Sequence, residues 1–223
     1  MSNTPAIAVS LVVLSLIALA LSILVLRRYL EKRQACHLYW GVGLVLVFVT
    51  VLEEVPLCVG VFSQLLILSY LVLVAVLVGI LSLGSAELAL SGRWKTLWFG
   101  YIGVVSAALV GVSAVTPVSS SIVVNGVVTG LPPLWVEILS SLVTVPAALF
   151  LIVASLYGAV RGHRWNLLYI AAGTAVISAA GALYIASFPV TLYYAEFVGV
   201  VLLFLGFVKV PGISSPTAQP QSA

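Results

Sequence analysis

The residues of this chain that could do chemistry are glutamates set within long apolar segments. All six acidic residues are glutamate, and Glu53 and Glu54 stand side by side near the end of the second segment. A helix rises about 1.5 Å per residue, which would place both carboxyl groups about 7–8 Å from the midplane of a bilayer. A charge at that depth is costly, so an acid there is a candidate functional residue.

Glu196 would lie at a similar depth in the last apolar segment, and two tyrosines could donate hydrogen bonds to this group of acids. Tyr193 precedes Glu196 by about one helical turn, and Tyr70 lies at a comparable depth in the third segment. Successive residues on a helix point about 100° apart, so only one of Glu53 and Glu54 is expected to face the helix bundle.

These five residues form the candidate site: Glu53, Glu54, Tyr70, Tyr193 and Glu196. No lysine, arginine or histidine is expected at their depth. The carboxyl groups must therefore be protonated and hydrogen-bonded, face a water-filled cavity, or bind an external cation. The functional interpretation is an acidic cavity for protons or cations, open to the outside. The alternative is that the glutamates only fix how the helices pack.

The composition identifies the class of protein that must position these residues. Hydrophobic residues make up 63% of the chain and charged residues only 7%, whereas a soluble domain has about 25% charged residues. The apolar runs reach 18 or more residues, which indicates membrane-spanning helices rather than barrel strands of about ten. We expect an all-α, multi-pass protein of the cell membrane whose surroundings are the lipid bilayer.

Seven apolar segments can be delimited, which predicts a seven-transmembrane-helix bundle. The segments cover residues 6–26, 38–59, 63–90, 97–115, 134–160, 167–187 and 190–208. Their turns place all nine lysines and arginines on one side of the membrane, at 27, 28, 32, 33, 93, 95, 161, 164 and 209. By the positive-inside rule, the N-terminus is outside and the C-terminus inside. Trp40 and three other tryptophans would anchor the cytoplasmic boundary, as interfacial aromatics do.

The loop after the fourth segment and the end of the chain differ from the rest. Asn125-Gly126 stands between β-branched runs, a pattern typical of a β-hairpin, so we expect a short outer hairpin between the fourth and fifth helices. A loop without strands is the alternative. Residues 211–223 are rich in Pro, Ser and Gln and are expected to be a disordered cytoplasmic tail.

Residues 1–210 are expected to form one transmembrane domain, and its helices can be divided as three, one and three. Residues 6–90 and 134–208 would then be parallel repeats. Leu38-Tyr39 followed by Gly43 corresponds to Leu168-Tyr169 followed by Gly173. Short matches of this kind also arise by chance in apolar sequence.

The sequence lacks the residues that most enzymes and cofactor proteins use. It contains no aspartate and only two histidines, and none of the common catalytic or nucleotide-binding motifs is present. His37 and His163 would lie at the membrane boundary rather than face each other at depth, which argues against haem. We expect no enzymatic activity, no cofactor, no metal and no nucleic-acid partner.

The order of helices and the expected outer hairpin resemble the microbial rhodopsins, which carry retinal on a lysine in the middle of the seventh helix. Here the only lysine of that segment is Lys209 at its end, and Glu196 occupies the middle region. The sequence from His37 to Glu54 and the Gly-rich last segment also resemble a prokaryotic family of uncharacterised seven-helix membrane proteins. That resemblance implies a fold and no particular activity.

Two functions remain after these exclusions. The first is a receptor, sensor or transporter-like bundle that responds to protons, cations or a small ligand through the acidic cavity. The second is a structural or accessory subunit that packs against a homo-oligomer partner or a larger membrane complex.

Overall fold

The computed structural model describes residues 4–118, 123–124, 127–128, 132–185 and 189–209. Within this part of the chain there are seven α-helices and one short 3-10 helix. The α-helices are α1 (Thr4–Lys32), α2 (Ala35–Cys58), α3 (Gln64–Ala89), α4 (Gly92–Val115), α5 (Leu134–Arg161), α6 (Leu168–Ile185) and α7 (Pro189–Lys209). The 3-10 helix η2 (Trp165–Leu167) leads into α6.

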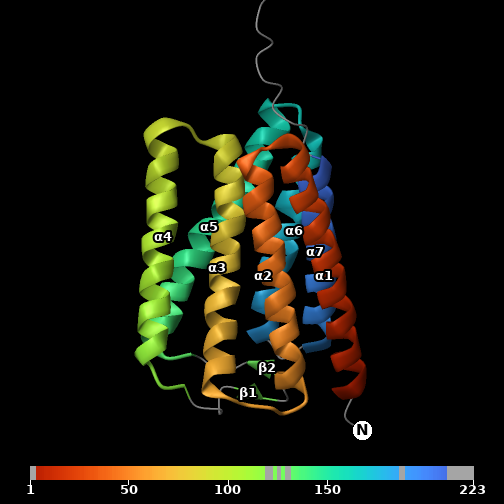
Figure 1. The fold of residues 1–223 in the computed structure, drawn as a ribbon, viewed down its shortest axis with the longest axis vertical. Coiled ribbons are helices and arrows are strands. Elements are labelled where there is room, and N and C mark those ends of the chain that lie inside the picture. Colours follow the sequence, from red (N-terminus) through yellow and green to blue (C-terminus); the bar gives the residue numbers. More distant parts are fainter. Residues whose placement is uncertain (1–3, 119–122, 125–126, 129–131, 186–188, 210–223) are drawn as a thin grey trace, which may run out of the picture.

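The helices form a bundle of two layers (Figure 1). Helices α4, α3, α2 and α1 lie side by side in one layer, and α5, α6 and α7 lie behind them. Chain neighbours pack against each other, and the layers are joined because α5 packs on α3 and α4 while α7 packs on α1. Helix α4 contacts only α3 and α5 closely, so it stands at one edge of the bundle.

Five helices, α1 to α5, are long and apolar enough to cross a membrane. The described parts of α6 and α7 contain shorter apolar stretches, Trp165–Ser178 and Tyr194–Val208. The chain is therefore a polytopic helical protein of the membrane type. Helices α1 and α4 continue beyond their apolar segments: α1 extends to Lys32, and α4 begins at Gly92. Polar residues at the membrane boundary can continue a helix that has already left the hydrocarbon.

The bundle is held together by a core that reaches across both layers. Trp40 of α2 is completely buried and stacks on Phe207 of α7, with ring centroids 4.6 Å apart. Gly84 of α3 makes room for it, since a Cβ there would lie 2.4 Å from the Trp40 ring. The expectation that Trp40 anchors the lipid boundary is therefore wrong. Trp94, Trp135 and Trp165 are largely exposed, as interfacial residues should be.

Helices α6 and α7 approach each other through glycines. A Cβ on Gly173 of α6 would lie 2.8 Å from the carbonyl oxygen of Gly199 and 2.9 Å from the backbone nitrogen of Leu203. Small residues permit such close backbone contact between membrane helices. The contact positions the part of α7 in which Glu196 lies.

The loop between α4 and α5 contains two two-residue strands, β1 (Val123–Val124) and β2 (Val127–Val128). They pair antiparallel, Val123 with Val128 and Val124 with Val127. Residues 125–126 lie outside the described residues. The short outer hairpin expected between the fourth and fifth helices therefore stays a prediction. The internal repeat also stays a prediction, as does the tail at 211–223, which falls outside the described residues.

Candidate functional site

Glu54 is the acidic residue of α2 that faces the protein interior. Its side chain is buried, whereas that of its neighbour Glu53 is only partly so. The Tyr70 hydroxyl of α3 donates a 2.8 Å hydrogen bond to Glu54 Oε1. Ser63 caps the N-terminus of α3 by accepting a hydrogen bond from the backbone of Leu66, which defines where that helix starts, two turns before Tyr70.

Glu196 of α7 completes the group from the other layer. Its carboxyl group lies within electrostatic range of the Glu54 carboxyl. Oε2 of Glu54 and Oε2 of Glu196 are both buried, and neither has a hydrogen-bond partner among the described residues. Three helices, α2, α3 and α7, thus bring two carboxyl groups and one phenol together.

The remaining members of the candidate site are less closely associated. Glu53 lies beside Ser69 of α3, and one of its carboxyl oxygens is buried without a partner among the described residues. Tyr193 belongs to α7, but its side chain lies outside the described residues. The structure thus joins Glu54 to Tyr70 directly, places Glu196 within electrostatic range of Glu54, and places Glu53 on an adjacent face of α2.

The glutamates outside this group have ordinary explanations. Glu137 lies in the first turn of α5, where a negative charge is favoured by the helix dipole. Glu87 is paired with Lys95, and Glu31 with Arg27 at 3.5 Å. The structure thus separates the buried pair, Glu54 and Glu196, from acids that helix ends and neighbouring cations account for.

The chemistry open to the pair follows from its surroundings. Two carboxylates that share a poorly solvated site repel each other unless a proton or a cation lies between them. Tyr70 can hold one carboxyl oxygen in place, while the two partnerless oxygens are free to accept a hydrogen bond or to ligate a cation. In the described part of the chain, no cluster of three His, Cys, Asp or Glu side chains has the arrangement of a metal site.

Sequence reasoning missed one polar contact between helices. Pro146 inside α5 has no N–H, so the carbonyl of Leu142, four residues earlier, lacks its usual helical donor. The Tyr101 hydroxyl of α4 donates to that carbonyl. The proline signals the missing donor, but nothing in the sequence indicates that Tyr101 supplies it.

Comparison with protein family models gave no match, and comparisons with curated proteins and with solved structures gave none either. The resemblance to the seven-helix family and the topological resemblance to the rhodopsins therefore stay predictions.

Proposed function

We propose that this chain is a seven-span integral protein of the cell membrane, with its N-terminus outside, that takes up a proton or a small cation between Glu54 and Glu196. The observation that carries the proposal is that two carboxyl groups from different layers lie within electrostatic range, each with one buried oxygen, and that Tyr70 is bonded to one of them. An acid inside a membrane segment is costly and is characteristic of ion and proton pathways.

The proposed orientation rests on the distribution of charge. The nine lysines and arginines lie in turns and at helix ends. If each of the seven helices crosses the membrane, all nine are on the same side of it. The glutamate pair belongs to the opposite half of the bundle. With the basic side in the cytoplasm, the site faces the outside. It serves in sensing or transport and uses no enzymatic step, no cofactor and no nucleic acid.

The experiment is a flux measurement on the full chain in liposomes. Wild-type protein should dissipate a proton gradient or an alkali-cation gradient, and E54Q and E196Q should each abolish that flux while leaving the protein folded. E137Q is the matched control, because it removes the same charge from the first turn of α5 and should retain the flux. Wild-type protein that is folded but passes neither protons nor cations would count against transport, and unchanged proton or cation binding in both variants would count against sensing.

One observation favours the second candidate, a subunit that packs laterally against a partner in the membrane. Gly100, Gly103 and Gly111 lie along exposed positions of α4, and a Cβ on any of them would meet nothing within 4 Å. Exposed small residues at such spacing allow a second helix to approach closely. Replacing Gly103 with Leu should then abolish an oligomer or complex seen after mild detergent extraction, whereas the same variant leaves the ion flux unchanged if the first function holds.

A further inference from the structure

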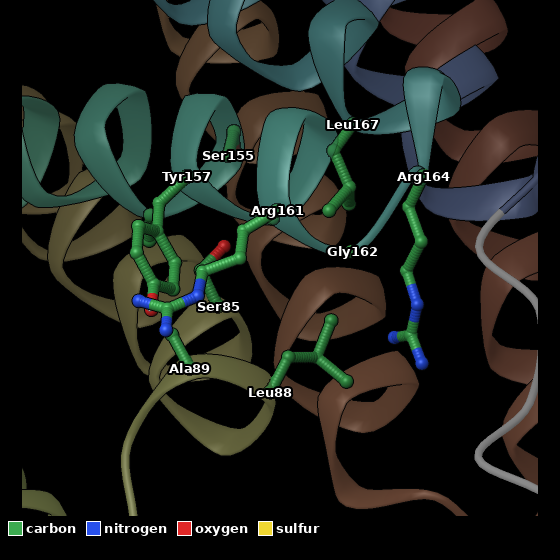
Figure 2. Close-up of a pocket in the computed structure, with 11 residues that line it drawn as sticks. Ser85, Leu88, Ala89, Ser155, Tyr157, Arg161, Gly162, Arg164 and Leu167 are labelled. Carbon is green, nitrogen blue, oxygen red and sulfur yellow. The ribbon is translucent and has the colours of Figure 1, made fainter.

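A basic cavity lies at the end of the bundle opposite the glutamate pair (Figure 2). It has a volume of about 370 Å³, within the range of small-molecule sites. Its walls are the C-terminal ends of α3 and α5 and the turn that leads through η2 into α6. The polar groups that line it include Arg161, Arg164, Tyr157, Ser85 and Ser155.

The cavity carries positive charge without a negative partner. No glutamate lines it, and within the described ranges no carboxylate lies at salt-bridge distance from Arg161 or Arg164, since the ion pairs found there are Arg27–Glu31 and Lys95–Glu87. Glu87, the acid of α3 closest in sequence to the cavity wall, is thus already paired. A cavity with two uncompensated guanidinium groups attracts an anion.

Arg161 is held in place by the local fold. The Arg161 guanidinium donates a 2.8 Å hydrogen bond to the Tyr157 hydroxyl and lies 5.6 Å from the centre of that ring. His163 has a left-handed backbone (φ 48°), which reverses the chain after α5. In Figure 2, Arg161 runs back along α5 toward Tyr157 and Ser85, while Arg164 extends on the far side of Leu88. A guanidinium group that is held like that of Arg161 suits a phosphate group, which accepts several N–H bonds at once.

The cavity continues into an apolar groove on the outer surface of α5. Tyr157 and Arg161 also line this groove, and its other walls are Val153, Leu156 and Val160. These three aliphatic side chains are 44–65% exposed and lie on a face of a membrane-type helix that none of the described helices covers. A basic cavity joined to an apolar strip that runs toward the bilayer centre has the polarity of a phospholipid: an anionic head and an alkyl chain.

We propose that the cavity binds the phosphate of an anionic phospholipid, with Arg161 and Arg164 on the headgroup and one acyl chain along Val153, Leu156 and Val160. Basic pockets between helices at a membrane boundary commonly hold such headgroups. Free inorganic phosphate also offers anionic oxygens to the arginines but would make no use of the groove. The proposal is independent of the function assigned to the glutamate pair.

The test uses the full chain in a neutral detergent and counts bound lipids by native mass spectrometry, with thermal unfolding measured in parallel. Three probes are added separately: phosphatidylglycerol, phosphatidylcholine and inorganic phosphate. The variants are R161Q/R164Q, the control R28Q/R93Q, which removes two cations from the same end of the bundle outside the cavity, and A89F, which narrows the cavity without changing its charge.

Phosphatidylglycerol should bind wild-type protein and the control and raise their unfolding temperature, while the other two probes should not. R161Q/R164Q should bind phosphatidylglycerol about 30-fold more weakly, since each arginine near an anionic headgroup contributes about fivefold. A89F should also weaken binding. Equal losses in the two double variants would overturn the proposal, because the attraction would then be diffuse. Equal stabilisation by inorganic phosphate would overturn the lipid assignment. A drop in unfolding temperature in R161Q/R164Q that is the same with and without phosphatidylglycerol would show that the arginines only stabilise the helix ends.

Discussion

The hydrogen bond from Tyr70 to Glu54 joins α2 to α3 at the position where an acid inside the membrane most needs a donor. The two residues are 16 positions apart in the chain, and the bond is 2.8 Å long. It fixes one carboxyl oxygen, while the other is buried without a hydrogen-bond partner in the described part of the chain. The orientation of the Glu54 carboxyl group thus depends on the uncharged hydroxyl of Tyr70.

Replacing Tyr70 with Phe should lower the free energy of unfolding by about 1 kcal/mol, within the range measured for hydrogen bonds between membrane helices. The reason is that a buried carboxyl oxygen loses its donor. The measurement is unfolding by sodium dodecyl sulfate titrated into protein in mild detergent. Y194F is the matched control, because Tyr194 is 71% exposed, and it should have no measurable effect. A double-mutant cycle with E54Q should show coupling, and strict additivity of Y70F and E54Q would contradict a direct bond.

Replacing Tyr101 with Phe should also destabilise the protein by about 1 kcal/mol, because the Leu142 carbonyl in α5 would lose the hydroxyl donor that replaces its missing helical one. In the P146A background residue 146 regains its N–H, so the same Tyr101→Phe change should become nearly neutral. Unfolding of the single and double variants in sodium dodecyl sulfate tests both statements. If Y101F costs the same in both backgrounds, the tyrosine does not compensate for the proline.

Replacing Gly173 with Ala should separate α6 from α7 and cost about 1–3 kcal/mol, the usual range for overpacking. The obstacle is backbone at 2.8 and 2.9 Å, which cannot rotate aside as a side chain could. G103A on α4 is the control, since a Cβ there meets nothing within 4 Å. Thermal unfolding in detergent should show a loss for G173A and none for G103A. Equal stability of the two variants would be inconsistent with the α6–α7 contact described above.

The proposed orientation can be tested with a membrane-impermeant maleimide on intact cells. Cys36 and Cys58 are both buried, so a reagent of this kind should label only an introduced cysteine. V61C, in the turn between α2 and α3, should be labelled from outside, whereas S91C, beside the basic turn after α3, should be labelled only after permeabilisation. Labelling of S91C in intact cells would reverse the orientation and move the glutamate pair to the cytoplasmic half.

Hydrophobic length predicts most of the helices of this chain, because each must satisfy its own backbone hydrogen bonds in lipid. The starts of α3 and α5 follow expectation within a residue or so. The start of α4 does not: the expected segment begins at Leu97, and the helix begins at Gly92. The transfer energy of the side chains determines where the chain leaves the hydrocarbon. It does not determine where the helix ends.

The candidate site is predictable in its residue types and not in its contacts. The depth of Glu53, Glu54 and Glu196 follows from counting along helices. Which of Glu53 and Glu54 faces inward depends on the rotation of α2 about its axis relative to α3. The sequence of an almost uniformly apolar helix carries little information about that rotation. For the same reason the burial of Trp40 could not be predicted, since it depends on Gly84 in another helix. The basic cavity could not be predicted either: in the sequence its arginines indicate only topology, and the cavity forms because the end of α3 lies beside them.

The pairing of Glu54 with Glu196 also sets an order of events during synthesis. The ribosome adds about 5–20 residues per second, so α7 emerges roughly 7–30 s after α2 has been synthesised. Tyr70 is synthesised soon after Glu54, from which it is 16 residues away. The Glu54 carboxyl group can therefore accept its hydrogen bond long before Glu196 has been synthesised. A nascent chain stopped before α7 would carry a single hydrogen-bonded acid in place of a repelling pair, and the proton or cation that we propose for this site could be taken up only when the last helix docks.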